Sequence, residues 1–259
     1  MAVAWQWLFA RSLHVEVPSA SRLGLFLTAW LIYLIDRFID ATSLAAEVRK
    51  SARQRFCANH KLIWLALAVI VALLDAVIVF DSLDRQTAIR GMLLGTIAVA
   101  YLVINWRLSK LWETLPLKEI SVGCLFTSGT LVVLAPQVRV ARSTISFAAI
   151  LFASLCALNC ISIAVWERDL DHAQRKHSIA TRWQHVRNYA QVLLILLASA
   201  CALLAFLDPS VWPLAICLGA SAVFLFALHF LPINRDDRTA LADLVLLTPL
   251  VFFLVEKIV

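Results

Sequence analysis

The sequence predicts an all-α protein, a bundle of about eight transmembrane helices that forms a single integral-membrane domain over residues 1–259. Three observations predict this fold class. Hydrophobic residues make up 62% of the chain and charged residues 15%, against about 45–50% and about 25% in soluble domains. The mean hydropathy is +0.84. Apolar stretches of about 20 residues, the length that crosses a bilayer, recur along the chain.

Eight apolar segments are long enough to span a bilayer. We expect these spans at 23–40, 62–80, 87–105, 119–135, 144–166, 189–207, 211–231 and 240–256. An apolar piece at 2–13 is too short to span. We interpret it as a truncated first helix or as an interfacial helix with Trp5 and Trp7 at the lipid headgroups. It is not a convincing signal peptide, because no basic residue precedes it and Arg11 follows it.

Basic residues predict the orientation of the bundle. The connections at 37–61, 106–118, 167–188 and 232–238 hold 16 of the 23 Lys and Arg residues, and the opposite side holds 7. The first set is therefore expected on the cytoplasmic side. This bias also accounts for the net charge of +6, and no nucleic-acid motif accompanies it. We expect an integral protein of a bacterial inner membrane, with lipids and not nucleic acid as partners.

Two acidic clusters follow apolar segments on this predicted cytoplasmic side. Asp36 and Asp40 are four positions apart, so both carboxylates leave one face of a helix. Glu167, Asp169 and Asp171 follow the segment 144–166. By the number of intervening spans, both helices run in the same direction. The two clusters are therefore expected at the same end of the bundle.

Carboxylates at a helix C-terminus repel one another and oppose the helix dipole, so they need cations. Mg²⁺ is the natural candidate, because it is held by one or two carboxylates together with substrate phosphates. The predicted metal ligands are Asp36, Asp40, Glu167, Asp169 and Asp171. The alternative is that Arg37 and Arg168 neutralise these groups in boundary salt bridges.

Basic and polar residues near the clusters are candidates for binding the phosphates of a ligand. Lys and Arg bind phosphates by charge and by paired hydrogen bonds. Lys118 follows Pro116 at the mouth of a helix, and Tyr33 lies about one turn before Asp36. The candidates are Lys118, Arg53, Arg175, Asn159 and Tyr33. Their alternative explanations are the cytoplasmic excess of basic residues and, for Tyr33, an interfacial aromatic position.

Two aspartate-rich motifs on parallel helices of such a bundle resemble the UbiA-type intramembrane prenyltransferases. Residues 36–40 are similar to the end of the first family motif, and residues 167–171, followed by Ser178, to the second. Lys118 falls where the family places a basic residue between the motifs. The resemblance covers nearly the whole chain in motif order and spacing.

The sequence also departs from the family pattern. Ile32 and Tyr33 stand where the first motif usually begins with Asn-Asp, and Glu167 replaces an Asp. Cys160 occupies an acidic position, and His177 stands where Lys is common. These changes reduce the expected number of Mg²⁺ ligands.

The resemblance implies an enzyme that transfers a prenyl group from an isoprenoid diphosphate to an acceptor within the membrane, with Mg²⁺ as cofactor. Chain length and acceptor stay open. So do a UbiA-type terpene cyclase and a non-catalytic or transport protein that binds an anionic lipid at the cytoplasmic face. Few ionisable residues near mid-segment and no visible repeat disfavour transport. A CDP-alcohol phosphotransferase is disfavoured because Asp36 and Asp40 lack the glycine of that pattern.

Overall fold

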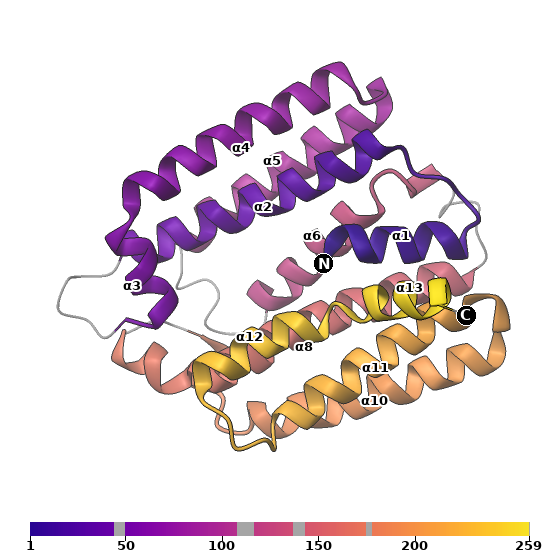
Figure 1. Ribbon diagram of the computed structural model, residues 1–259. Coiled ribbons are helices and arrows are strands. Elements are labelled where there is room, and N and C mark those ends of the chain that lie inside the picture. Colours follow the sequence, from indigo (N-terminus) through magenta and orange to yellow (C-terminus); the bar gives the residue numbers. More distant parts are fainter. Residues whose placement is uncertain (44–49, 108–116, 137–142, 175–177, 259) are drawn as a thin grey trace.

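The computed structural model describes residues 1–43, 50–107, 117–136, 143–174 and 178–258, and these ranges are helical without a strand (Figure 1). The helices confirm the predicted all-α bundle. In chain order they are α1 (Ala2–Ser12), α2 (Ser19–Thr42), α3 (Ala52–Asn59), α4 (Lys61–Asp81), α5 (Arg85–Arg107), α6 (Leu117–Leu131), α8 (Ser143–Ala173), α9 (Ile179–Arg182), α10 (Val186–Leu207), the short turn η2 (Pro209–Val211), α11 (Trp212–Leu228), α12 (Arg235–Val245) and α13 (Thr248–Ile258).

Five of the described helices are long and apolar enough to cross a membrane: α4, α5, α8, α10 and the stretch formed by η2 with α11. The bent pair α12 and α13 makes a sixth if it counts as one span. Of the eight predicted spans, those at 23–40 and 119–135 are outside this set. The first lies in α2, which carries Asp36, Arg37 and Asp40 near its end, and the second begins in α6, which has only 15 residues.

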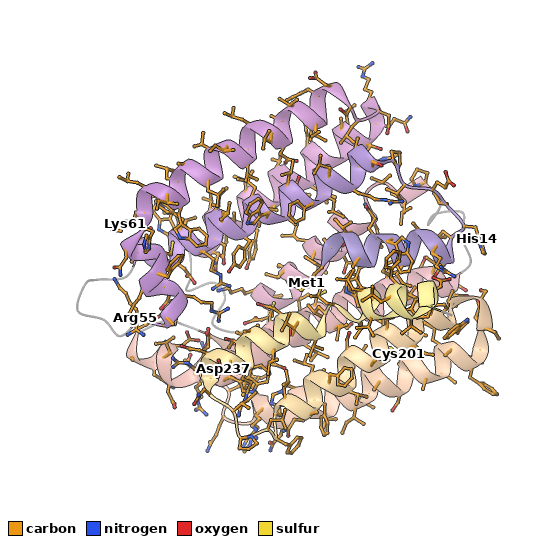
Figure 2. All side chains as sticks on the ribbon, in the orientation of Figure 1. Met1, His14, Arg55, Lys61, Cys201 and Asp237 are labelled. Carbon is orange, nitrogen blue, oxygen red and sulfur yellow. The ribbon has the colours of Figure 1, made fainter. Side chains whose placement is uncertain are left out.

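The outer faces of the long helices are apolar. Leu62 and Phe80 of α4 are 82% and 72% exposed, and Phe206 of α10 is 83% exposed. Figure 2 shows hydrocarbon side chains projecting along the outer side of α4. Large apolar side chains that point outward along a whole helix are expected where lipid, not water, surrounds the protein.

The bundle has a large core and a small one. In the large core, Phe152 and Leu155 of α8 pack with Leu194 of α10 and Leu218 of α11. In the small core, Leu27 and Leu34 of α2 pack against Val71 of α4, among other residues. Figure 1 shows α2, α4 and α5 along one side and α8 with α10 to α13 along the other.

Helix α6 lies against α8 at very short range. A Cβ atom added at Gly123 would collide with the backbone carbonyl oxygen of Ala153 and press on Ala157. Small residues allow two helix backbones to approach in this way, which is a common means of helix association in membranes. This contact sets the position of the N-terminus of α6, which carries Lys118.

The N-terminal helix α1 is short, as expected, but its predicted interfacial alternative is wrong for Trp5. This side chain is fully buried, its ring lies 4.6 Å from that of Phe152, and its Nε1 donates a hydrogen bond of 2.8 Å to the carbonyl of Leu246. Trp7 is half-buried and meets Phe253 edge to face at 5.1 Å. Helix α1 is therefore part of the packed bundle.

The segment 240–256 was expected as one helix but forms two, α12 and α13, which bend by 49° at their junction. Pro249 is the second residue of α13. Proline has no N–H to donate to the carbonyl four residues earlier, so the helix cannot run through it. The break frees the carbonyl of Leu246, which Trp5 then satisfies.

The described helix ends that flank the four connections predicted to share one side do lie at one end of the bundle (Figure 1). In Figure 2 this end is marked by Arg55, Lys61 and Asp237, and the opposite end by His14. Helix α8 continues to Ala173, beyond the expected end at residue 166. The C-termini of α2 and α8 and the N-terminus of α12 thus meet at this charged end.

Candidate functional site

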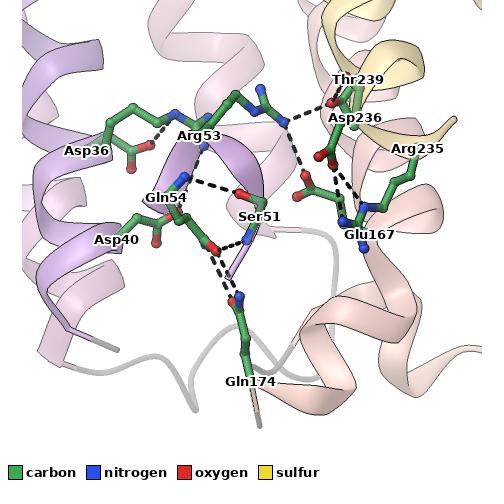
Figure 3. A network of polar contacts seen from close by, with 11 residues as sticks. Asp36, Asp40, Ser51, Arg53, Gln54, Glu167, Gln174, Arg235, Asp236 and Thr239 are labelled. Atoms are coloured by element: carbon green, nitrogen blue, oxygen red, sulfur yellow. Dashed lines mark hydrogen bonds and ion pairs between the residues drawn. The ribbon is translucent and has the colours of Figure 1, made fainter. Parts of the chain in front are cut away.

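Helix α3 lies between the two acidic clusters (Figure 3). Its start is set by a capping box: the Ser51 N–H donates to Gln54 Oε1 at 3.0 Å, and the Gln54 N–H donates to Ser51 Oγ at 3.3 Å. This helix was not expected, although Ser followed three positions later by Gln is a known signal for a helix start. The capping box fixes the direction in which Arg53 and Gln54 leave the chain.

Arg53 and Gln54 connect α3 to the other helices of the charged end. Arg53 Nη2 lies 3.1 Å from Glu167 Oε1 of α8 and donates to Thr239 Oγ1 of α12 at 2.9 Å. The buried amide of Gln174 donates to Gln54 Oε1 at 2.8 Å. Through α3, therefore, the second acidic cluster is held against the end of α2 (Figure 3).

Arg37 is the centre of the first cluster. Its guanidinium lies 3.9 Å from Asp36 and 3.9 Å from Asp40, and 5.4 Å from the ring centre of Tyr33. Its charge also interacts with that of Glu167. The structure thus brings together five predicted site residues near Arg37: Asp36, Asp40, Glu167, Arg53 and Tyr33.

The second cluster is spread around α8 and does not form one acidic face. Because α8 is continuous through these residues, Glu167 and Asp171 lie four positions apart on one face. Asp169 is turned by about 200° from Glu167 and is exposed, whereas Glu167 and Asp171 are half-buried. The structure therefore separates Asp169 from Glu167, the carboxylate that contacts α3.

The predicted phosphate-binding residues Lys118 and Arg175 have no described contact with Arg37 or Arg53. Lys118 is half-buried in the first turn of α6 and interacts electrostatically with the buried Glu119 and with Cys160 of α8. Arg175 lies outside the described residues, as does His177. No described contact joins Lys118 to Arg53.

Polar residues deeper in the bundle were missed as site candidates. Asp243 of α12 interacts with the side-chain amide of Asn159 and with the charges of Arg53 and Arg37. Tyr101 of α5 interacts with the charge of Asp36. Asp243 and Tyr101 both lie within predicted apolar segments, and no local motif marks them. Only the arrangement of α5, α8 and α12 in space reveals that these two residues lie near the clusters.

A small cavity of about 170 Å³ opens beside Arg37 and Arg53, lined also by Tyr33, Cys57 and Trp64 among others. Burial raises the pKa of the Cys57 thiol, so this cysteine is protonated at neutral pH. The cavity wall therefore combines two guanidinium groups with aromatic surface. This combination suits an anionic group attached to an apolar chain.

A larger and almost wholly apolar cavity of about 510 Å³ lies among α5, α6 and α8. Its lining includes Leu93, Leu131 and Ile150, with Thr127, Ser128 and Arg90 as polar members. Such a surface can accept hydrocarbon.

The predicted magnesium ligands are divided between α2 and α8. Among the described residues, no three His, Cys, Asp or Glu side chains lie close enough together to hold a metal ion. The donor set nevertheless fits Mg²⁺ in kind, because Asp36, Asp40 and Glu167 supply hard carboxylate oxygens and Mg²⁺ takes much of its shell from phosphates and water.

Comparisons with protein-family models, curated proteins and solved structures find no significant match.

Proposed function

We propose that this protein is a membrane-embedded prenyltransferase that transfers the prenyl group of an isoprenoid diphosphate to an acceptor within the bilayer. One observation carries the proposal: Asp36 and Asp40 of α2 and Glu167 of α8 are gathered around Arg37 and Arg53 at one end of an apolar bundle. A diphosphate is the ligand that such alternating carboxylates and guanidinium groups would bind, given divalent cations between them.

In this proposal the carboxylates and the basic residues have different roles in binding the diphosphate. Asp36 with Asp40, and Glu167 with Asp171, would hold Mg²⁺, which neutralises charge on the departing diphosphate. Arg37 and the residues predicted from the sequence, Arg53 and Lys118, would donate hydrogen bonds to phosphate oxygens. These donors stabilise the leaving group most when its charge is greatest, and this lowers the barrier to breaking the allylic carbon–oxygen bond.

A row of aromatic side chains on α2 supports a path for the prenyl chain. Phe26, Trp30 and Tyr33 are all exposed and lie at helical spacing, and the row ends at Arg37. The rings of Phe26 and Trp30 are 5.7 Å apart, and the Arg37 guanidinium lies over Tyr33. A chain lying along this row would present its diphosphate to the arginines.

The proposed membrane topology is UbiA-like with eight spans, and the charged end faces the cytoplasm of a bacterial cell. Helix α2 has 24 residues, which corresponds to about 36 Å at 1.5 Å per residue, long enough to cross a bilayer. The excess of basic residues at the charged end supports the orientation.

A second candidate function is non-catalytic binding of an anionic lipid. The observation that favours it is that the arginines already neutralise the carboxylates: Arg37 with Asp36 and Asp40, and Arg53 with Glu167. A terpene cyclase would use the same diphosphate site, so only its products would differ.

Binding of geranylgeranyl diphosphate to the protein in detergent, with and without Mg²⁺, tests the proposal. We expect Mg²⁺-dependent binding that is lost in both Asp36→Ala and Glu167→Gln. Asp237→Asn is the matched control, because Asp237 is an exposed acid at the same end whose described contact is with Asn234 on its own helix. Binding that is indifferent to Mg²⁺ and to both substitutions would instead support the lipid-binding candidate.

A further inference from the structure

The apolar cavity of about 510 Å³ is a groove at the end of the bundle away from the charged end. Helices α5 and α8 begin, and α6 ends, at this end (Figure 1). Helix α6 packs against both α5 and α8 and forms the floor of the groove between them. Leu93 of α5 and Ile150 of α8 line its sides and are 62% and 61% exposed, so the groove opens to the surrounding lipid.

Small side chains on α8 make room for an occupant of this groove. Ala149 and Ala153 lie in its lining, where larger side chains would fill the space. The volume falls within the range of about 300–1,000 Å³ that is usual for sites of small molecules. Protein interiors are otherwise closely packed, so a space of this size is expected to hold hydrocarbon from the membrane.

The hydroxyl group of Thr127 lacks a hydrogen-bond partner in the part of the chain that the structure describes. Serine and threonine within helices often donate to the carbonyl four residues earlier, as Thr96, Thr130 and Ser154 do here. Thr127 does not, although it is only 7% exposed and lines the groove. Because buried polar atoms are rarely left unpaired, a ligand with a hydrogen-bonding group is expected beside it.

Arg90 places a positive charge at one end of the groove. It is the sixth residue of α5, about 8 Å from the start of the helix. Its Nη2 donates to the neutral amide oxygen of Gln86 at 3.2 Å, and its charge acts through space on the exposed Asp84. It forms no ion pair with another described residue. Since a charge within a bilayer is costly without a counter-ion, an anionic group is favoured beside Arg90.

The order of these groups along the groove selects the occupant. Arg90 lies toward the membrane surface, and the apolar walls extend to Ala153, about 15 Å from the start of α8. The hydroxyl of Thr127 lies within this lining. A phospholipid carries the matching groups in the same molecule: a phosphate, ester carbonyls that accept hydrogen bonds, and acyl chains. A soluble anion lacks the hydrocarbon, and a neutral lipid lacks the charge that Arg90 would bind.

We propose that the groove is a binding site for an anionic phospholipid of the leaflet away from the charged end. Its phosphate accepts hydrogen bonds from Arg90, one of its ester carbonyls accepts from Thr127, and one acyl chain lies between α5 and α8 over α6. Arg90 is separated from Arg107, at the other end of α5, by about 25 Å. The lipid site is therefore distinct from the proposed diphosphate site and does not depend on prenyl transfer.

Two lipids with the same acyl chains test the role of the charge: dioleoylphosphatidylglycerol, which has a phosphate, and dioleoylglycerol, which has none. Their dissociation constants are measured by native mass spectrometry of the full chain in detergent. We expect the first to bind about tenfold more tightly, the size of effect that a hydrogen bond to a charged group gives.

Arg90→Gln should abolish this preference. Arg85→Gln is the matched control and should keep it, because Arg85 is exposed at the start of the same helix and lies outside the lining. Thr127→Val, which keeps the shape but removes the hydroxyl, should weaken both lipids by about fivefold, since both carry ester carbonyls. Equal binding of the two lipids by the wild type overturns the site, and so does a preference that survives in Arg90→Gln.

The position of the lipid is tested with phosphatidylglycerol that carries a photoreactive diazirine in one acyl chain. We expect crosslinks in residues 124–135 and 149–153, and their loss in Ala149→Phe, which fills the groove. Crosslinks confined to other helices would overturn the site even if binding were selective. The crosslinks of the wild type decide this without the filled variant, should that variant fail to fold.

An excess of geranylgeranyl diphosphate separates this inference from the proposed function. It should leave the crosslinks unchanged, because the proposed diphosphate site lies at the opposite end. Displacement of the lipid would make the groove part of the prenyl path and would overturn a separate site. If the wild type binds phosphatidylglycerol in the groove but does not bind geranylgeranyl diphosphate, the lipid site stands and the prenyl transfer falls.

Discussion

Arg53 of α3 and Glu167 of α8 are 114 positions apart in the chain, yet their side chains meet at 3.1 Å. Both are partly shielded, with 32% and 21% of their side chains exposed. Since Arg53 also donates to Thr239, one guanidinium fixes α3 against both α8 and α12. Helix α3 is therefore connected to the second acidic cluster by a contact that can be measured.

We expect Arg53→Gln and Glu167→Gln to lower the free energy of unfolding, with a coupling of about 1 kcal/mol in the double-mutant cycle. The reason is that each single change already removes the ion pair, so the second change costs less. Unfolding by denaturant in detergent measures the four species. Additive effects would show that the ion pair does not contribute to stability.

Helix geometry makes a further prediction about the second cluster. Glu167 faces Arg53, whereas Asp169 is exposed on another face of α8. We expect Glu167→Ala to weaken Mg²⁺-dependent binding of geranylgeranyl diphosphate at least about tenfold more than Asp169→Ala, because only the first carboxylate points into the site. Isothermal titration of both variants decides this. Equal losses would mean that the end of α8 rearranges when ligand binds.

The close contact of α6 with α8 predicts that Gly123→Ala is strongly destabilising. Its new methyl group would meet the backbone of Ala153, which cannot move aside as a side chain could. We expect a loss of about 1–3 kcal/mol or more, read from the thermal unfolding midpoint. Gly91→Ala and Gly95→Ala are the controls, since nothing lies within 4 Å of a Cβ at either position, and alanine there should be neutral or favourable.

The buried indole of Trp5 predicts a cost for removing one hydrogen bond. Trp5→Phe keeps an aromatic ring against Phe152 but leaves the carbonyl of Leu246 without its donor. We expect a loss of about 1–3 kcal/mol in the free energy of unfolding. Trp7→Phe, at a half-buried position, should cost clearly less. Similar losses for the two variants would indicate that ring volume, and not the hydrogen bond, matters at Trp5.

Local sequence signals account for much of the fold but not for the assembly of the site. Apolar length predicted the long helices, and two missed features had signals of their own: Ser51 with Gln54 marks the start of α3, and Pro249 marks the break before α13. The burial of Trp5 depends on which helices surround α1. The sequence of a short apolar helix does not show whether the helix lies in a protein core or at the membrane surface.

The candidate site could likewise be predicted only in part from local sequence signals. The spacing of Asp36 and Asp40 predicted a shared face, and the count of spans predicted that Glu167 lies at the same end. The spacing of Glu167, Asp169 and Asp171 suggested one cluster only if the helix ended before it, and α8 does not end there. The meeting of Asp243 with Asn159 joins positions 84 apart on two helices, α8 and α12, and no local pattern encodes it.

The last prediction concerns pH and the turn between α4 and α5. Asp84 precedes α5, and its Oδ2 accepts the Thr87 N–H at 2.9 Å. These hydrogen bonds from Thr87 lower the pKa of the Asp84 carboxyl group below its usual value. A carboxyl group whose pKa is lower in the folded state stabilises the fold above its unfolded pKa, and this contribution is lost as the pH falls through the folded value.

We therefore expect Asp84→Ala to cost on the order of 1 kcal/mol at neutral pH, the usual value of a helix N-cap. The difference from wild type should begin to shrink as the pH falls below about 4, the usual pKa of an aspartate, and should be lost once the pH has also fallen through the lower pKa of the folded state. Thermal unfolding midpoints across this range measure it, with Asp81→Ala, at the exposed end of α4, as the control. A difference that is constant with pH would show that the carboxylate charge of Asp84 is not what caps α5, because only a charged cap is lost by protonation.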